Sequence, residues 1–351
     1  MELGGQMDLL QRLGITHPIF VAPMAGTSTP ELAAAVSNAG GLGALGLCAS
    51  NAETAKQAIL RTQQLTDKPF QVNFFCHQPT AYDAEKAQQW INYVRPHFDE
   101  FDVEVPTQLN EIYQSFVSND DLLKVVLDTK PKAVSFHFGL PTAEQISALK
   151  QAGIITLVTV TQLSEAYLAQ QAGIDVLIAQ GVEAGGHRGT FNPSCDAGLT
   201  TLDLVIILNQ YFDLPIVAAG GIMTGEDIRL YLELGASATQ LRTAFVQCKE
   251  SAANDAYREL LFEQPITQIT DNISGRPARG LLNAWHQFVD LPARPSHAGY
   301  PFTYDLAKQL HAVASKQDEQ GFGAYWAGSN VANIRRLDAK ELVEKLVQEL
   351  Q

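Results

Sequence analysis

The fold predicted from this sequence rests on two copies of one short pattern, QAGIITLVTV (151–160) and QAGIDVLIAQ (171–180). In each copy a glycine follows an amphipathic stretch and precedes a run of apolar and β-branched residues. Glycine readily takes the left-handed turn that ends a helix, and buried parallel strands consist of such runs. The pattern therefore predicts a helix, a tight turn and a strand, used repeatedly.

Similar apolar runs occur on both sides of these copies. Eight predicted strands alternate with helical stretches before about residue 245, and eight is the strand number of a TIM barrel. We therefore predict an α/β fold built on a TIM (β/α)8 barrel. The predicted strands cover 18–24, 41–46, 70–75, 133–138, 156–160, 176–180, 215–219 and 238–243.

Two stretches do not fit this repeated unit. Residues 79–130 are too long for one crossover helix, so extra helices are expected after the third strand. Residues 248–304 include a loop rich in Gly, Pro and Arg and predict a small substrate-covering domain. The barrel would then comprise 1–247 and 305–351, with an amphipathic helix at the end of the chain.

The composition indicates a globular protein with a large core. Apolar residues make up 46% of the 351 residues and charged residues 18%, and the formal net charge is −14 without any Lys/Arg run. This balance argues against binding to nucleic acid or to an anionic membrane surface. Residues 1–14 show no apolar signal core and no stretch of about 18 apolar residues follows, so a cytoplasmic location is expected.

Two patterns that suggest ligand sites have simpler interpretations. The four cysteines form no CxxC pair, and we expect buried thiols with neither a disulfide nor a metal site. Gly41, Gly43 and Gly46 match GxGxxG, but a helix precedes them and they lie in a strand. A dinucleotide fingerprint needs the opposite order, so we expect only a closely packed helix-to-strand turn.

Barrel enzymes place their active residues at the C-terminal ends of the strands. The chain has amide, imidazole and glycine backbone groups at these positions, which predicts one polar site at the barrel mouth. The predicted strand ends carry Pro23, Met24, Asn73, His137, Gln180, Gly220, Gly221 and Thr243.

The pair Gly220 and Gly221 follows the seventh predicted strand, where barrels commonly bind phosphate. With TGED (224–227) opening the next helix, unhindered backbone N–H groups are expected here. The alternative is that the two glycines only form a tight turn.

The segment EAGGHRG (183–189) follows the sixth predicted strand and surrounds one histidine with glycines. Such a loop lets the backbone approach a flat ligand while the imidazole points into the mouth. His187 is therefore the leading catalytic candidate. His137 remains open between a site residue and a core histidine bonded to a backbone carbonyl.

A set of motifs spanning most of the chain resembles the nitronate monooxygenases, formerly called 2-nitropropane dioxygenases, of the first class. The resemblance lies in PIFVAPMAG, QVNFF, SFHFG, EAGGHRG and AAGGI, and in the tail motifs YPFTYDLAK (300–308) and YWAG (325–328). It implies one non-covalent FMN and oxidation of alkyl nitronates, such as propionate 3-nitronate, by O2 to a carbonyl compound and nitrite.

The resemblance also implies roles for individual residues. His187 would be catalytic, and His137, Tyr300 and Tyr304 would line the substrate space. The family usually has Gly where this chain has Arg242, whose side chain would intrude on the cofactor, point outward or contact phosphate. The expected cofactor-binding residues are Pro23, Met24, Asn73, Gln180, Gly185, Gly220, Gly221, Arg242, Thr243 and Lys308.

Two other functions stay open at this point. Related FMN barrels use NAD(P)H as enoyl-thioester or quinone reductases and share the strand with proline and methionine and the His loop. A flavin-binding protein without turnover is the second alternative, since a fold alone does not establish activity. The sequence predicts a monomer or a homodimer without deciding between them.

Overall fold

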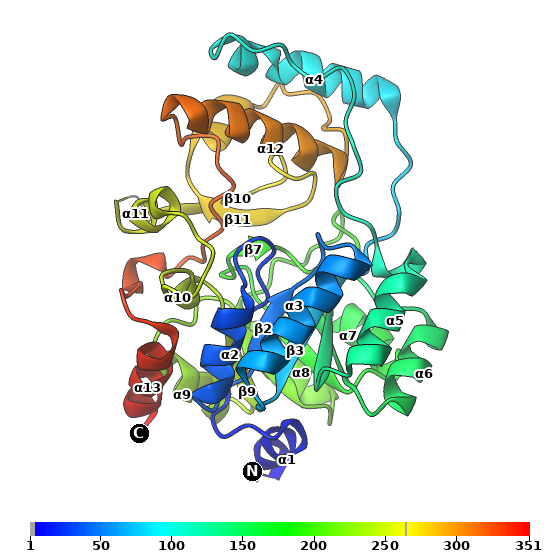
Figure 1. Ribbon diagram of the computed structural model, residues 1–351, viewed down its shortest axis with the longest axis vertical. Coiled ribbons are helices and arrows are strands. Elements are labelled where there is room, and N and C mark those ends of the chain that lie inside the picture. The colour runs from blue at the N-terminus through cyan, green and yellow to red at the C-terminus, as the bar shows by residue number, and fades with distance from the viewer. Residues whose placement is uncertain (1–3, 264) are drawn as a thin grey trace.

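The computed structural model describes residues 4–263 and 265–351 and has a closed parallel barrel at its centre (Figure 1). The strands follow the order β1-β9-β8-β6-β5-β4-β3-β2, and a parallel bridge between Phe20 and Leu42 joins the first strand to the last. All pairings in this sheet are parallel. The predicted TIM barrel is confirmed.

Each barrel strand lies within or beside a predicted run. Short buried runs between helical stretches were a sufficient signal because both faces of these strands are covered. The barrel strands are β1 (Ile19–Val21), β2 (Gly43–Gly46), β3 (Phe70–Phe75), β4 (Ala133–His137), β5 (Ile155–Val160), β6 (Val176–Gln180), β8 (Ile216–Ala219) and β9 (Ala238–Leu241).

Helices surround the barrel, and α13 packs against α9 and α2 to close the outer ring. The amphipathic helix predicted at the end of the chain is α13. The outer helices are α2 (Pro30–Asn38), α3 (Ala52–Leu65), α5 (Asp120–Thr129), α6 (Ala143–Gln151), α7 (Leu163–Ala172), α8 (Thr201–Tyr211), α9 (Gly225–Glu233) and α13 (Ala339–Leu350).

The interior of the barrel is a packed core. Helix α1 (Gly4–Leu13) lies at the N-terminal end of the strands, and Leu9 and Leu13 share a buried cluster with inward-facing strand residues such as Phe20 and Leu157. This end of the barrel is therefore filled, and a ligand has room at the opposite end.

The glycines of the repeated pattern behave as predicted. Gly153 and Gly173 have φ values of +73° and +79°, the left-handed conformation that ends a helix. Gly43 serves close packing instead, because a Cβ there would lie 2.0 Å from the carbonyl oxygen of Ala33. The GxGxxG match is thus a helix-to-strand turn.

A second layer covers the C-terminal end of the barrel (Figure 1). We call it the cap. Its small antiparallel sheet has the order β10-β11-β7, and a hydrophobic cluster separate from the barrel core holds it together. The cap is built from α4 (Ala84–Asp99), β7 (Gly186–His187), β10 (Thr267–Thr270), β11 (Ala278–Leu281), the π-helix η2 (Trp285–Val289) and α12 (Phe302–Ala314).

The cap cluster extends beyond the predicted domain 248–304 on both sides. Helix α4, within the stretch predicted to add helices, packs against α12, which continues past residue 304. Each has one apolar face, and the two faces are buried against each other. The sequence gives no local signal for this contact, because about 200 residues separate the two helices.

The remaining helices are short connections between the barrel and the cap. No helix in residues 4–263 and 265–351 is long and apolar enough to cross a membrane. Three cysteines are buried as expected, but Cys195 is exposed, since it lies in an open loop. The connecting helices are α10 (Thr243–Val246), α11 (Asp255–Glu263), η1 (Phe116–Ser118), η3 (Ser315–Gln317) and η4 (Val331–Asn333).

Candidate active site

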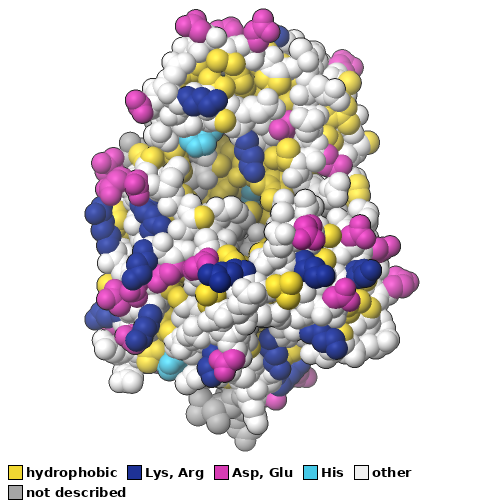
Figure 2. Space-filling view, in the orientation of Figure 1, with side chains coloured by type: hydrophobic (Ala, Val, Ile, Leu, Met, Phe, Trp, Pro, Cys, Tyr) yellow, Lys and Arg dark blue, Asp and Glu magenta, His cyan; other side chains and the backbone are white. Residues whose placement is uncertain are grey.

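A pocket lies at the C-terminal ends of the barrel strands, beneath the cap. Its volume is about 1080 Å³ when the open space at its mouth is included. The space-filling view shows a hollow between the cap and the barrel, lined by hydrophobic side chains (Figure 2). The polar residues predicted at the strand ends meet in this pocket.

Most of the predicted site residues line the pocket. Tyr300 and Lys308 do not: both belong to the cap and lie behind the pocket wall. The predicted residues that line it are Pro23, Met24, Asn73, His137, Gln180, Gly185, His187, Gly220, Gly221, Arg242, Thr243 and Tyr304.

His187 occupies a two-residue strand, β7, and not a free loop. It pairs with Ala278 of β11, so its backbone is fixed by the cap. Its ring lies edge-on to Phe138 and Tyr304, with centroids 5.6 and 5.9 Å away, and 5.2 Å from the ring of Trp326. The imidazole is therefore held in an aromatic cage that opens on the pocket.

The environment of His187 favours the neutral imidazole. Burial lowers its pKa well below 6.5, and the nearby His137, Arg276, Arg242 and Lys308 lower it further. Its Nε2 atom is buried and has no hydrogen-bond partner among the described residues. A neutral ring with a free nitrogen can accept a proton or a hydrogen bond at physiological pH.

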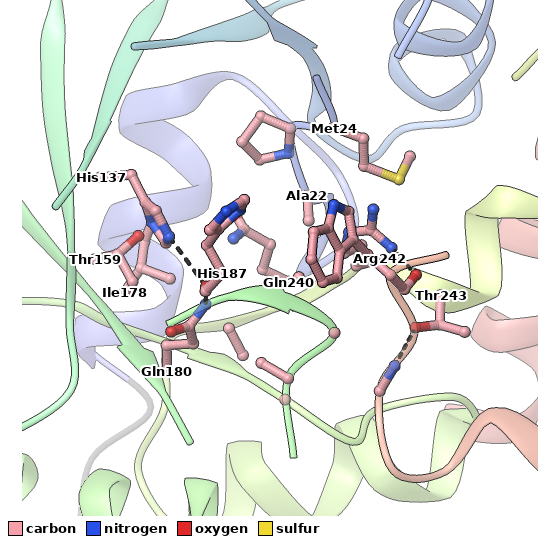
Figure 3. Close-up of a pocket in the computed structure, with 18 of the residues that line it drawn as sticks. Ala22, Met24, His137, Thr159, Ile178, Gln180, His187, Gln240, Arg242 and Thr243 are labelled. Carbon is pink, nitrogen blue, oxygen red and sulfur yellow. Dashed lines mark hydrogen bonds between the residues drawn. The ribbon is translucent and has the colours of Figure 1, made fainter. Parts of the chain in front are cut away.

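Two side chains hold the backbone of His187 (Figure 3). Gln180 donates from Nε2 to the His187 carbonyl oxygen at 3.0 Å, and the ring of His137 contacts the same oxygen through Nε2 at 3.2 Å. The amide oxygen of Gln180 accepts from the Gly189 N–H at 2.7 Å. His137 thus lines the pocket and bonds a backbone carbonyl, combining both interpretations left open by the sequence.

The pKa of His137 is lowered to about 4, mainly by burial, while the contact with the His187 carbonyl opposes this shift. His137 is therefore also neutral at physiological pH. Because its Nε2 faces a carbonyl oxygen, the bond requires the tautomer that carries the proton on Nε2.

Arg188 holds the segment that carries His187 in place, although no role was predicted for Arg188 from the sequence. Its side chain is fully buried and forms two hydrogen bonds to Asp196, of 2.7 and 3.0 Å. It also donates to the carbonyl oxygens of Gln180 and Gly181 at 3.0 and 2.6 Å. The preceding residue in the chain, His187, is thereby fixed from both sides.

Lys308 and Tyr300 form an outer layer above the pocket. The Lys308 ammonium lies 4.9 and 5.0 Å from the ring centroids of Tyr113 and Tyr304, both of which line the pocket. Burial lowers the pKa of Lys308. Tyr300 stacks on Tyr113 at 6.1 Å and lies edge-on to His187 at 6.0 Å. Both residues thus touch pocket-lining side chains.

Glycines let the backbone approach the pocket closely. A Cβ on Gly185 would lie 2.5 Å from the backbone nitrogen of Gly328. The Thr243 hydroxyl accepts from the same nitrogen at 2.9 Å and joins this tail segment to the barrel. Asn73 donates to Ser135, which leaves its amide oxygen available. Small and polar residues at this part of the wall let the backbone lie close to a flat cofactor.

The turn after β8 matches only part of the prediction. Among the described residues, no hydrogen bond from the Gly221 N–H is formed, but the N–H groups of Met223 and Thr224 donate to Asp227 at 2.8 and 3.0 Å. Gly225 donates to Glu349. The N–H groups of Met223, Thr224 and Gly225 are therefore used within the protein, whereas that of Gly221 is free in the described part of the chain.

Arg242 lines the pocket, but its side chain turns toward the tail of the chain. Its guanidinium donates to the carbonyl oxygen of Trp326 and to the Tyr257 hydroxyl, the latter at 3.4 Å. Its Nε lies 3.3 Å from the position of a Cβ on Gly186. The close-up shows His187 between His137 and Arg242 (Figure 3).

Several residues of the pocket wall were not predicted from the sequence. Phe75 ends a predicted strand, so that rule could have found it, whereas Gln240 lies next to the end of β9, which stops two residues before the predicted strand end. Tyr113 lies in an irregular stretch with no pattern, and Trp326 belongs to a quoted tail motif that received no role. The missed residues include Phe75, Tyr113, Gln240, Trp326, Gly328 and Asn330.

Comparisons with known proteins show which family the chain resembles. The family model described as nitronate monooxygenase matches residues 7–349. A nitronate monooxygenase from Paraburkholderia phytofirmans is 48% identical over 349 residues, covering 99% of this chain and 95% of that protein. One from Pseudomonas aeruginosa is 49% identical over 341 residues, covering 96% and 97%.

Structural comparison gives the same result. A nitroalkane oxidase from Streptomyces ansochromogenes has a TM-score of 0.87 and 38% sequence identity, and the match covers 97% of each chain. Both sequence and fold are thus shared over nearly the whole length. The chain belongs to the nitronate monooxygenase family of flavin-dependent oxidoreductases.

Proposed function

We propose that this chain binds one FMN non-covalently in the pocket and oxidises small alkyl nitronates, such as propionate 3-nitronate, to a carbonyl compound and nitrite. Family membership already makes it an enzyme that acts on nitronates with O2. The proposal adds the form of the flavin, the size of the substrate and the residues involved.

The charge of the pocket carries this proposal. No aspartate or glutamate is among its described lining residues, whereas Arg242 lines it and Lys308 lies directly behind Tyr113 and Tyr304. The chain as a whole carries a net charge of −14, so this local excess of positive charge favours anions at one place only. FMN and nitronates are both anions.

FMN would be held mainly by backbone and amide groups. The Gly220–Gly221 turn offers N–H groups to the phosphate, and Asn73 and Thr243 offer polar side chains along the wall. Pro23, Met24 and Gly185 complete the close-fitting surface. Bound FMN would supply the oxidising chemistry.

His187 is the proposed catalytic residue. A preformed nitronate needs only orientation and hydrogen bonds, whereas a neutral nitroalkane must first lose a proton from carbon. Burial lowers the pKa of His187, so its imidazole is unprotonated and free to accept that proton, although the same shift reduces its basicity. Gln180 and His137 fix its backbone, and Tyr304 and Trp326 limit the rotation of its ring.

Two measurements test the proposal. Mass analysis of the cofactor released from the purified protein should give FMN, and aerobic incubation with propionate 3-nitronate should release nitrite. FAD, or no flavin, contradicts the cofactor assignment. Bound FMN without nitrite release contradicts the substrate assignment and favours a flavin-binding protein without turnover.

The NAD(P)H-dependent reductases are the second candidate, because they share the strand with proline and methionine and the glycine-rich His segment. Anaerobic mixing with NADH in a stopped-flow spectrophotometer separates the two. We expect no bleaching of the flavin band by NADH and rapid bleaching by propionate 3-nitronate. The reverse result would support the reductase.

A further inference from the structure

We infer that Arg242 supplies a fixed positive charge on the His187 side of the pocket, where it stabilises the negative charge of the reduced cofactor and does not bind the phosphate. This inference rests on the proposed binding of FMN. It concerns a residue at which this chain differs from the usual sequence of the family it resembles.

The direction of the side chain is the first argument. Arg242 follows β9 directly, and its backbone adjoins Thr243. Its guanidinium nevertheless lies against Gly186, the neighbour of His187, and bonds the carbonyl oxygen of Trp326. The Trp326 ring is 5.2 Å from the His187 ring. The charge of Arg242 is therefore on the same side of the pocket as the proposed catalytic histidine.

The phosphate turn has different neighbours. A Cβ on Gly221 would meet the side chains of Glu183 and Asn330, at 3.1 and 3.4 Å, and one on Gly220 would meet Thr201 at 2.5 Å. None of the closest atoms at either glycine belongs to Arg242. The contacts of Arg242 and those of the turn are thus separate sets.

The charge of Arg242 has no carboxylate partner. None of the salt bridges of the described residues includes it, and its hydrogen-bond acceptors are a carbonyl and a hydroxyl oxygen. A guanidinium stays protonated in proteins, so an uncompensated positive charge faces a partly desolvated space. Such a charge stabilises an anion strongly.

The placement of Arg242 also affects the pKa values of neighbouring groups. Arg242 is one of the charges that lower the pKa of His187, after burial, His137 and Arg276, and it also acts to lower the pKa of Tyr304. Both effects require the guanidinium to be close to these side chains. Lys308 faces the same two residues from α12.

Reduction of a flavin by two electrons and one proton adds one negative charge to its ring system at neutral pH. A fixed positive charge near the ring stabilises that form over the oxidised one. The two guanidinium contacts keep the charge in place, so little reorganisation is needed. Arg242 should therefore make the bound flavin easier to reduce.

The test compares the FMN-loaded enzyme with Arg242→Gln, which removes the charge, and Arg242→Lys, which keeps it. We expect Arg242→Gln to shift the equilibrium between oxidised and reduced flavin at least tenfold toward the oxidised form, about 30 mV in the two-electron midpoint potential. The midpoint potential of Arg242→Lys should stay close to that of the unmodified enzyme. Arg336→Gln, which changes an exposed arginine, is the control and should leave it unchanged.

Binding of FMN and of riboflavin, which lacks the phosphate, gives a second measurement. If Arg242 acts on the ring, Arg242→Gln changes both affinities alike and their ratio stays within about twofold. If it binds phosphate, the variant loses at least tenfold in FMN affinity with little change for riboflavin. The second result, or an unchanged midpoint potential, overturns the inference.

These outcomes are separable from failure of the proposed function, which would appear as absence of FMN or of nitrite release in the unmodified enzyme. If Arg242→Gln fails to fold or to retain FMN, the potential of Arg242→Lys and its affinities for FMN and riboflavin still test the inference. A lysine variant with a potential as low as expected for a neutral side chain, or with a selective loss of FMN, contradicts the inference.

Discussion

The side chain of Gln180 joins two points of the segment that carries His187: its Nε2 donates to the His187 carbonyl oxygen at 3.0 Å and its Oε1 accepts from the Gly189 N–H at 2.7 Å. A residue at the end of a barrel strand thus determines where the proposed catalytic histidine lies. Both ends of its amide are used for this purpose.

Replacing Gln180 by Met keeps the volume but removes these two bonds and a longer one, of 3.4 Å, that Arg188 donates to the same amide oxygen. We expect nitrite release from a nitronate to fall about tenfold, because His187 is no longer held in one orientation. The loss of stability should be about 1–3 kcal/mol, since the Gly189 N–H is left buried without a partner. Steady-state assays and urea unfolding measure the two effects. Unchanged kcat in a destabilised protein would show that the contact serves only the fold.

His187→Asn separates two roles of one side chain. Turnover of a neutral nitroalkane should fall by roughly 10² or more, since the base is lost. Turnover of the preformed nitronate should fall less, because that proton has already gone. Bound flavin and the folded state should be retained, as β7 stays paired through its backbone. Wild-type rates on both substrates would exclude His187 and direct attention to His137.

The ion pair of Arg188 and Asp196 makes a prediction about stability. Asp196→Asn leaves the fully buried guanidinium without a counter-charge, so unfolding should need about 3 kcal/mol less free energy. As a matched control, Glu259→Gln breaks the exposed pair with Arg336 and should cost less than about 1 kcal/mol. If the two variants lose the same free energy of unfolding in urea, burial does not make the Arg188–Asp196 pair more important than the exposed pair.

The burial of His77 leads to a prediction of how the free energy of unfolding depends on pH. It is 1% exposed, neither ring nitrogen has a partner among the described residues, and burial lowers its pKa to about 4. Between pH 6.5 and about 4 the unfolded chain binds a proton that the folded protein excludes, so stability falls as the pH decreases. His77→Phe removes this contribution.

The expected size follows from the pKa difference. At pH 5 the exclusion of this proton from His77 costs about 2 kcal/mol, since one pKa unit corresponds to about 1.4 kcal/mol. The loss of stability on going from pH 7.5 to pH 5 should therefore be about 2 kcal/mol smaller in His77→Phe than in the unmodified protein. Urea unfolding at both pH values measures it, and parallel losses would exclude His77 as a source.

The amino-acid sequence was sufficient to predict the barrel and the position of its mouth. The periodicities of strands and helices can be recognised within about ten residues of sequence. The same is true of the glycines that end helices, such as Gly153 and Gly173. Because parallel strands end at one side of a barrel, the strand-end residues Asn73, Gln180 and Thr243 could be assigned to one pocket from their positions in the chain alone.

The surroundings of His187 and the direction of the Arg242 side chain depend on contacts between distant parts of the chain. The cage contains Tyr304 and Trp326, more than a hundred residues away in sequence, and the contact of Arg242 with the Trp326 carbonyl depends on the path of the tail. Such contacts follow from how α4 and α12 bury their apolar faces together above the barrel. Burial of this kind is a property of the assembled fold, and no local pattern encodes it.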